Sequence, residues 1–491
     1  MAVLEWKQKP VDNASKVPAL SNWTPIIGFM LERTTSIAAL FYYKLVLTVQ
    51  VDDVSGEVLA KIKQRRNGYS DDITNNKARA FFDVREIVNT RLVDTVDDQN
   101  NTTIPFQSIH TLGANEDATK IFSVNGDKNF GFTQIGTFFM SGFENYSSAA
   151  NASPADDTTN KIIYTSRFLQ ASLPLFTPRS TDSEYVQSNA FDVYNMSGSN
   201  DRFLSDVQLG SNPVSTLAVG RINYIQENDY HTIAFLNDTT YYASEAHNFL
   251  ISYYDSADAQ IGSTQTIPNS STNGGEKPNG TITPAKSLLY FGCGPGNLEA
   301  SNVVPSGGSA GDARPSNFAN WQYYTVRAFD SGSSASKSAL YTFIKQNGSC
   351  KGFKVRRLAW RNSVGGYDYY NFNMKSTQTL NVERNNYNAL IGTYNKSVWR
   401  YNDTQRGKTT RQTTATLKET LNTDFISETD AFLIEKLLMS TSVYIIENPD
   451  TEFTEAVMIT DSSIVKKTVA NDKLIQYTIN IEYANPVNTN S

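Results

Sequence analysis

The sequence has few of the residues on which most hydrolytic enzymes and metal proteins depend. Only three histidines occur in 491 residues, and no Asp-His-Ser or Cys-His arrangement can be assembled from local motifs around them; they are His110, His231 and His247. The HExxH, CxxC and EF-hand patterns are absent, so the sequence predicts neither a zinc site nor a helix-loop-helix calcium site. We therefore expect no histidine catalysis, no metal and no cofactor.

Cysteines and long apolar runs are equally scarce. Cys293 and Cys350 are the only two cysteines, which leaves either one disulfide or two ordinary thiols and excludes a disulfide framework. The sequence contains no run of about 18 apolar residues, which argues against a membrane-spanning helix. Residues 1–35 lack the basic start and apolar stretch of a secretory signal, so no signal peptide is expected.

Charge is sparse and mixed in sign. Charged residues make up 19% of the chain and its net charge is −6, so the protein as a whole does not attract nucleic acid or anionic lipid. The longest basic cluster, KIKQRR at residues 61–66, follows an apparent strand. It can be a solvated strand end or a phosphate site, and one short run does not form a nucleic-acid-binding surface. We predict neither a nucleic-acid nor a membrane partner.

Aromatic and small polar residues are abundant instead. The 26 Tyr and 26 Phe suit pleated strands, while Asn, Ser and Gly suit turns. A chain of this length should divide into roughly two to four domains. We predict a mainly β, multidomain protein of antiparallel sandwich or jelly-roll-like modules. Its expected parts are an extended N-terminal arm (1–35), a β-rich domain with long loops (36–240), a β-sandwich domain (241–395) and a small α+β domain (396–491).

Periodic patterns mark individual elements. Residues 41–51 alternate apolar and polar side chains, and residues 58–62 return after an Asp-rich turn, which predicts a hairpin. Near the C-terminus, Ser427 followed three residues later by Asp430 is typical of a helix start, and the apolar spacing from Ala431 predicts about three helical turns. Three further strands are expected after that helix.

The most specific stretch is Phe353–Met374, FKVRRLAWRNSVGGYDYYNFNM. It reads as strand, tight loop and strand, with a bulge expected between Val355 and Leu358. Gly365 and Gly366 would allow positive φ in the loop, and Asp368 would hydrogen-bond back across it. The aromatic residues of this hairpin can be buried in a sandwich or form a sugar-stacking platform; the candidates for such a platform are Tyr367, Tyr369 and Tyr370.

This hairpin also resembles a motif of structural proteins from tailed bacteriophages, especially marine ones. The positions that carry the resemblance are Trp360, Asn362, Gly365, Gly366, Asp368, Tyr370 and Phe372. Two other segments, Ser287–Leu298 and Leu421–Ser442, are similar to the same group, so the resemblance covers roughly the C-terminal half. It implies a virion component of the tail, neck or baseplate region, assembled in the host cytoplasm, and it implies no catalytic residues.

We therefore expect a non-enzymatic structural protein that forms a homo-oligomeric ring or sleeve and contacts copies of itself and other virion proteins. Trp6 and Trp23 are the expected contact residues of the N-terminal arm. The alternative is a carbohydrate-binding adhesin or tail-fibre protein that recognises a host-surface glycan. A depolymerase is a third hypothesis, which requires two carboxylates about 5 to 9 Å apart across a sugar.

Overall fold

The computed structural model describes the chain in separate stretches. These are residues 4–8, 19–20, 28–35, 37, 39–51, 56–65, 78–92, 110, 121–124, 135–172, 192–211, 219–237, 246–268, 287–298, 314–315, 318–346, 352–401, 404, 407–446, 454–461, 463 and 475–485. They form two compact units. Unit 1 holds the described residues of Met1–Gln346 together with Arg361–Asp368, and unit 2 holds those of Asn347–Trp360, Tyr369–Glu447 and Phe453–Ser491.

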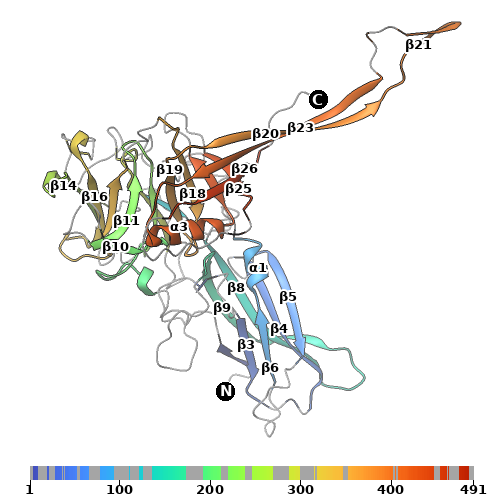
Figure 1. Ribbon diagram of the computed structural model, residues 1–491. Coiled ribbons are helices and arrows are strands. Elements are labelled where there is room, and N and C mark those ends of the chain that lie inside the picture. The colour runs from blue at the N-terminus through green and yellow to red at the C-terminus, as the bar shows by residue number, and fades with distance from the viewer. Residues whose placement is uncertain are drawn as a thin grey trace. The chain divides into compact units, whose positions relative to one another are not determined.

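The first part of unit 1 consists of two sheets that share one core (Figure 1). In pairing order, the five-stranded sheet contains β2 (Ala19–Leu20), β9 (Ala155–Leu169), β8 (Ile135–Ser147), β4 (Phe41–Val51) and β5 (Val58–Arg65). The three-stranded sheet contains β1 (Leu4–Gln8), β3 (Gly28–Arg33) and β6 (Arg79–Asp83), followed by the short helix α1 (Arg85–Asn89). Leu45 and Leu47 of β4 meet Leu31 and Phe82 in this core, as the alternation in β4 predicts.

The described residues of the expected N-terminal arm belong to this core. Strand β1 pairs with β3, Leu4 is fully buried, and the Trp6 ring packs edge-on against Tyr164 with centroids 6.5 Å apart. These residues are held in place because their apolar side chains complete the second sheet's inner face, so we no longer assign them to an assembly arm. Trp23 lies outside the described residues.

The second part of unit 1 is a β-sandwich. Its six-stranded sheet contains β10 (Leu209–Ser211), β11 (Val219–Ile225), β17 (Tyr341–Lys345), β16 (Tyr323–Phe329), β13 (Asn248–Tyr254) and β14 (Gln260–Pro268). The facing sheet contains β12 (Thr232–Asn237), β15 (Ser287–Gly292) and β7 (Ile121–Val124), and two short 3-10 turns are η2 (Asp192–Tyr194) and η3 (Phe318–Asn320).

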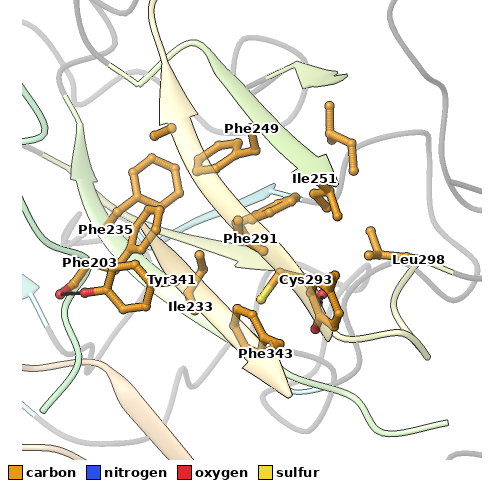
Figure 2. Close-up of a cluster of buried hydrophobic side chains, with 14 of the residues drawn as sticks. Phe203, Ile233, Phe235, Phe249, Ile251, Phe291, Cys293, Leu298, Tyr341 and Phe343 are labelled. Atoms are coloured by element: carbon orange, nitrogen blue, oxygen red, sulfur yellow. Dashed lines mark hydrogen bonds between the residues drawn. The ribbon is translucent and has the colours of Figure 1, made fainter. Parts of the chain in front are cut away.

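Aromatic rings fill the space between these two sheets (Figure 2). Phe249 of β13 stacks on Phe291 of β15 with ring centroids 4.3 Å apart, and it meets Phe235 of β12 at 5.1 Å. Phe235 and Phe249 lie on opposite sides of the domain boundary expected at residue 240, so that boundary would divide one continuous core. Cys293 is buried in the same core, and Cys350 lies outside the described residues.

Unit 2 is a seven-stranded sheet with one helix. In pairing order the strands are β19 (Tyr367–Phe372), β18 (Arg356–Arg361), β24 (Val443–Ile446), β25 (Thr454–Ile459), β26 (Thr478–Tyr483), β23 (Lys408–Asn422) and β20 (Thr377–Asn388), with a small hairpin of β21 (Thr393–Asn395) and β22 (Val398–Arg400). Helix α3 (Glu428–Leu438) starts as predicted, because the Ser427 side chain accepts a hydrogen bond from the Asp430 N–H. Its apolar face joins the core through Ile434 and Leu437.

The mainly β, multidomain architecture predicted from the sequence is confirmed. Within the described stretches nearly all strand pairs are antiparallel, and the parallel exceptions are β2 with β9 and β11 with β17. The boundary expected between residues 395 and 396 falls inside the β21–β22 hairpin, where Asn395 pairs with Val398. No helix in the described part of the chain is long and apolar enough to cross a membrane.

Candidate functional site

The motif hairpin forms as predicted, but its residues are divided between the two units. Strands β18 and β19 are neighbours joined by a tight loop, with the Asn362 N–H donating to the Gly366 carbonyl at 3.0 Å. Trp360, Tyr370 and Phe372 are buried in the core of unit 2. The loop Arg361–Asp368 instead belongs to unit 1. The bulge expected between Val355 and Leu358 is absent: β18 starts at Arg356, and its pairing with β24 from Arg357 to Trp360 shows no register shift.

Asn362 organises the loop. Its side-chain Oδ1 accepts from the Val364 and Gly366 N–H groups at 3.2 and 2.8 Å, and its Nδ2 donates to the Leu204 carbonyl at 2.8 Å. An amide is suited to this role because it has donors and an acceptor on one short side chain. The two glycines differ in function. Gly365 has φ of +95°, as expected. Gly366 instead lets the loop backbone lie close to residue 204, because a Cβ at position 366 would lie 2.1 Å from the Leu204 carbonyl oxygen.

Asp368 bonds to Asn362 of the loop, as expected, and it is also held by the segment that precedes β10. Its carboxylate accepts from Ser205 Oγ at 2.5 Å and from the Asp206 N–H at 2.9 Å. The Asp206 carboxylate in turn accepts from the N–H and hydroxyl of Ser363 at 2.9 and 2.8 Å. Burial, together with the neighbouring Asp206 charge, raises the pKa of Asp368 to about 7. These contacts bind the loop to unit 1.

The buried carboxyl group should make stability depend on pH. The pKa of Asp368 in the folded protein lies above its ordinary value of 3.8, so the group favours folding when protonated, and that contribution is lost as the pH rises from about 4 to about 7. Asp368→Asn should remove this loss of stability at higher pH. Urea unfolding curves of both proteins between pH 4 and 8 should show the variant gaining at least about 1 kcal/mol relative to wild type as the pH rises. If the free energy of unfolding of the two proteins changes equally with pH, the raised pKa of Asp368 is contradicted.

The tyrosines of the motif do not form a sugar-stacking platform. Tyr367, Tyr369 and Tyr370 are each no more than 5% exposed. The Tyr367 ring packs edge-on against His110 with centroids 4.8 Å apart, and the Arg357 guanidinium lies 5.0 Å from the centre of the Tyr369 ring. A ring that is buried on both faces has no face left for a pyranose, so a sugar site would have to be built elsewhere.

The histidines also lie in structural surroundings. His110 and His231 are buried, and His231 packs edge-on against Phe343 at 4.9 Å. Burial lowers the pKa of His247, with a smaller opposing effect of Asp330. No group of three or more potential metal-ligating side chains occurs within the described residues.

The sequence reading missed the most exposed element of unit 2, which we call the arm and define as residues 380–417. Strands β20 and β23 pair along their length from Thr377 to Asn388, whereas β26 covers β23 only from Lys418 to Asn422. Beyond that point, among the described residues, the two strands pair only with each other. Figure 1 shows β20 and β23 running out of the sheet side by side, with β21 at their far end.

Large apolar side chains are concentrated on the arm. Of the 17 exposed large hydrophobic side chains among the described residues, nine belong to it. They are Leu380, Val382, Tyr387, Leu390, Ile391, Tyr394, Val398, Trp399 and Tyr401. Soluble monomers rarely expose such a concentration of apolar surface, and where it occurs it marks an interaction site.

The tip of the arm has a defined structure. Trp399 Nε1 donates to the Ile391 carbonyl at 3.0 Å, and Gly392, with φ of +104°, leaves room for the indole ring, since a Cβ there would lie 2.4 Å from Trp399 Nε1. Leu390, Tyr394 and Tyr401 are close to this fold-back in sequence and are 80%, 67% and 73% exposed. The tip therefore presents apolar groups to solvent from a fixed scaffold.

The arm is also basic in an acidic protein. Residues 380–417 contain six Lys or Arg and two Asp or Glu, a net charge of +4, which leaves −10 on the rest of the chain. Within the described residues none of five arm cations makes an ion pair; these are Arg384, Lys396, Arg400, Lys408 and Arg411. Exposed, unpaired cations beside apolar rings are typical of a surface that meets an acidic partner.

Comparison with known proteins adds no family: no protein-family model matches the chain, and no curated protein matches it in sequence.

Proposed function

We propose that the chain is a non-enzymatic structural protein that assembles into a homo-oligomeric ring or sleeve, with the arm of one copy docked on the next. The observation that carries this proposal is the arm, which holds nine of the exposed large apolar side chains within the described residues. A two-stranded ribbon is marginally stable in water by itself. Docking on a partner would bury its apolar side chains and so stabilise the ribbon.

A second copy of the chain is the partner that the charges favour. The arm carries +4 and the rest of the chain −10, so each copy offers both members of a complementary pair. A contact between an arm and a different surface of the next copy is heterologous, and such contacts close into rings when the rotation between copies permits. The proposed contact therefore generates the ring without a second kind of subunit.

The resemblance of the motif hairpin to phage structural proteins supports the virion as the setting. We propose the tail, neck or baseplate region as the location, with other virion proteins as further partners after assembly in the host cytoplasm. Electron microscopy of purified particles with an antibody against the chain tests this part. Absence of the chain from particles would contradict it, and would leave the self-assembly proposal to be judged separately in solution.

Self-assembly is tested with Leu390→Ser/Tyr394→Ser/Tyr401→Ser. These side chains are 67% to 80% exposed, so their loss should leave folding unchanged. Because buried aromatic anchors dominate interface energies, the triple variant should weaken self-association by at least about tenfold. Mass photometry and light scattering across a concentration series measure the effect.

The matched control removes three exposed apolar side chains from unit 2 outside the arm. Phe425→Ser/Met439→Ser/Met458→Ser changes residues that are 62%, 66% and 53% exposed, and its self-association should equal that of wild type. A wild-type chain that stays monomeric at every concentration, or a control variant that dissociates as readily as the arm variant, would contradict the proposed contact.

A further inference from the structure

A pocket of about 1030 Å³ opens on unit 1 where β4 begins. Its walls come from the first residues of β4, the end of β5 and the turn between β8 and β9. The side chains that matter chemically are Tyr42, Tyr43, Lys44, Arg65, Asn151 and Ser153. The pocket thus combines two aromatic rings, two cations, an amide and a hydroxyl.

A β-bulge turns Tyr42 toward this pocket. Phe41 pairs with Ser147 and Lys44 with Asn145, so two residues of β4 oppose one residue of β8. Tyr42 has φ of +56°, a conformation that costs energy for a bulky side chain. Its hydroxyl donates to the Ala150 carbonyl at 2.8 Å, yet the residue stays 60% exposed. Bulges and strained residues of this kind cluster at binding sites, where they redirect a side chain.

Two cations face each other beside the ring. Lys44 and Arg65 are directly opposite partners in the β4–β5 ladder, and like charges in that position destabilise a sheet. Within the described residues neither has a neutralising ion pair. A bound anion between them would relieve the repulsion.

Two other cations of the basic KIKQRR segment, Lys61 and Lys63, do have an acidic partner. Lys61 and Lys63, on the same face of β5, both pair with Asp156, the second at 3.4 Å. The Arg33 guanidinium near Tyr43 is likewise paired, with Glu144 at 2.6 Å. Of these cations, the two that line the pocket are the ones for which the described part of the chain supplies no acid.

We propose that this pocket binds an acidic saccharide, with the carboxylate between Lys44 and Arg65 and a sugar ring against Tyr42. An aromatic face suits the apolar face of a pyranose, and Asn151 and Ser153 offer partners for sugar hydroxyls. The volume is that of a site for a ligand of several rings, far larger than an inorganic anion needs. The residues that line the pocket include none from the arm, so the proposal does not depend on assembly through the arm.

Isothermal titration calorimetry with a hexuronate tetrasaccharide tests the proposal, with neutral maltotetraose and inorganic phosphate as comparison ligands. Wild type should bind the acidic oligosaccharide most tightly, and more weakly as salt screens the charges. Lys44→Gln/Arg65→Gln should weaken this binding by at least about tenfold, because it removes both charge-assisted contacts.

Two further variants distinguish binding in the pocket from an effect of overall charge or of lost stability. Lys61→Gln/Lys63→Gln removes the same charge from the same strand face outside the pocket and should leave binding within about twofold of wild type, since long-range charge is screened. Tyr42→Gly should weaken binding while keeping the melting temperature near that of wild type, because glycine accepts positive φ without strain. The proposal is overturned if no oligosaccharide binds, if phosphate binds as tightly, or if the two double variants bind equally.

Discussion

Gly366→Ala is expected to lower the free energy of unfolding by more than about 3 kcal/mol, the range of severe steric defects. The added methyl group would lie 2.1 Å from the Leu204 carbonyl oxygen and 3.1 Å from the Ala234 Cβ. Leu204 cannot easily retreat, because its N–H donates to the Ala234 carbonyl at 2.8 Å and its carbonyl accepts from Asn362. The loop must therefore leave its place in unit 1.

Denaturant unfolding measures this effect, and Gly198→Ala provides the control. At Gly198 a Cβ would meet only the Asp201 Oδ1 at 4.0 Å, so the control should change stability by less than about 1 kcal/mol. If Gly366→Ala unfolds at the same denaturant concentration as Gly198→Ala, the close contact between the loop and Leu204 is not present in solution.

Arg356→Met should destabilise the protein by about 3 kcal/mol, since it leaves a buried carboxylate without its cation. Arg356 Nε donates to Glu419 Oε1 at 2.9 Å, and the side chains are 7% and 0% exposed. Gln378 and the Tyr483 hydroxyl donate to the other oxygen at 3.0 and 2.8 Å. Burial acts to raise the pKa of Glu419, but these three donors outweigh it and hold the pKa below its ordinary value.

A double-mutant cycle distinguishes this charge effect from lost packing. Adding Glu419→Gln removes the stranded charge while keeping an acceptor for Gln378 and Tyr483, so the double variant should be more stable than Arg356→Met alone by at least about 1 kcal/mol. Thermal or urea unfolding followed by circular dichroism reports both values. Additive losses would show that Arg356 contributes mainly through its alkyl chain.

The parts of the fold that follow from local chemistry could be predicted from the sequence. Alternation in residues 41–51 predicts β4, the serine at 427 predicts the start of α3, and the Gly-Gly loop predicts the β18–β19 hairpin. Each of these three elements is determined by interactions between residues that lie a few positions apart in the sequence. The positive φ at Gly365 was predictable in the same way.

What could not be predicted depends on partners far away in sequence. The role of Gly366 comes from the carbonyl of residue 204, and the acid that pairs with Lys61 is at position 156. The arm was divided by an expected domain boundary at 395, because its Thr-rich strands give no sign of where β26 stops covering them. The pocket could not be predicted because a bulge at Tyr42 does not change the alternation of apolar and polar residues in the sequence.

The assignment of Arg361–Asp368 to unit 1 has a consequence for how the chain is made. On the ribosome, all of unit 1 up to Gln346 emerges before the loop that seats against Leu204 and Asp206. Until the loop has been synthesised, the Leu204 carbonyl lacks its Asn362 donor and the Asp206 carboxylate lacks its Ser363 donor. Unit 1 therefore cannot reach its final state during translation of its own main segment, and a gene truncated at residue 346 would encode a fragment with that site unfilled.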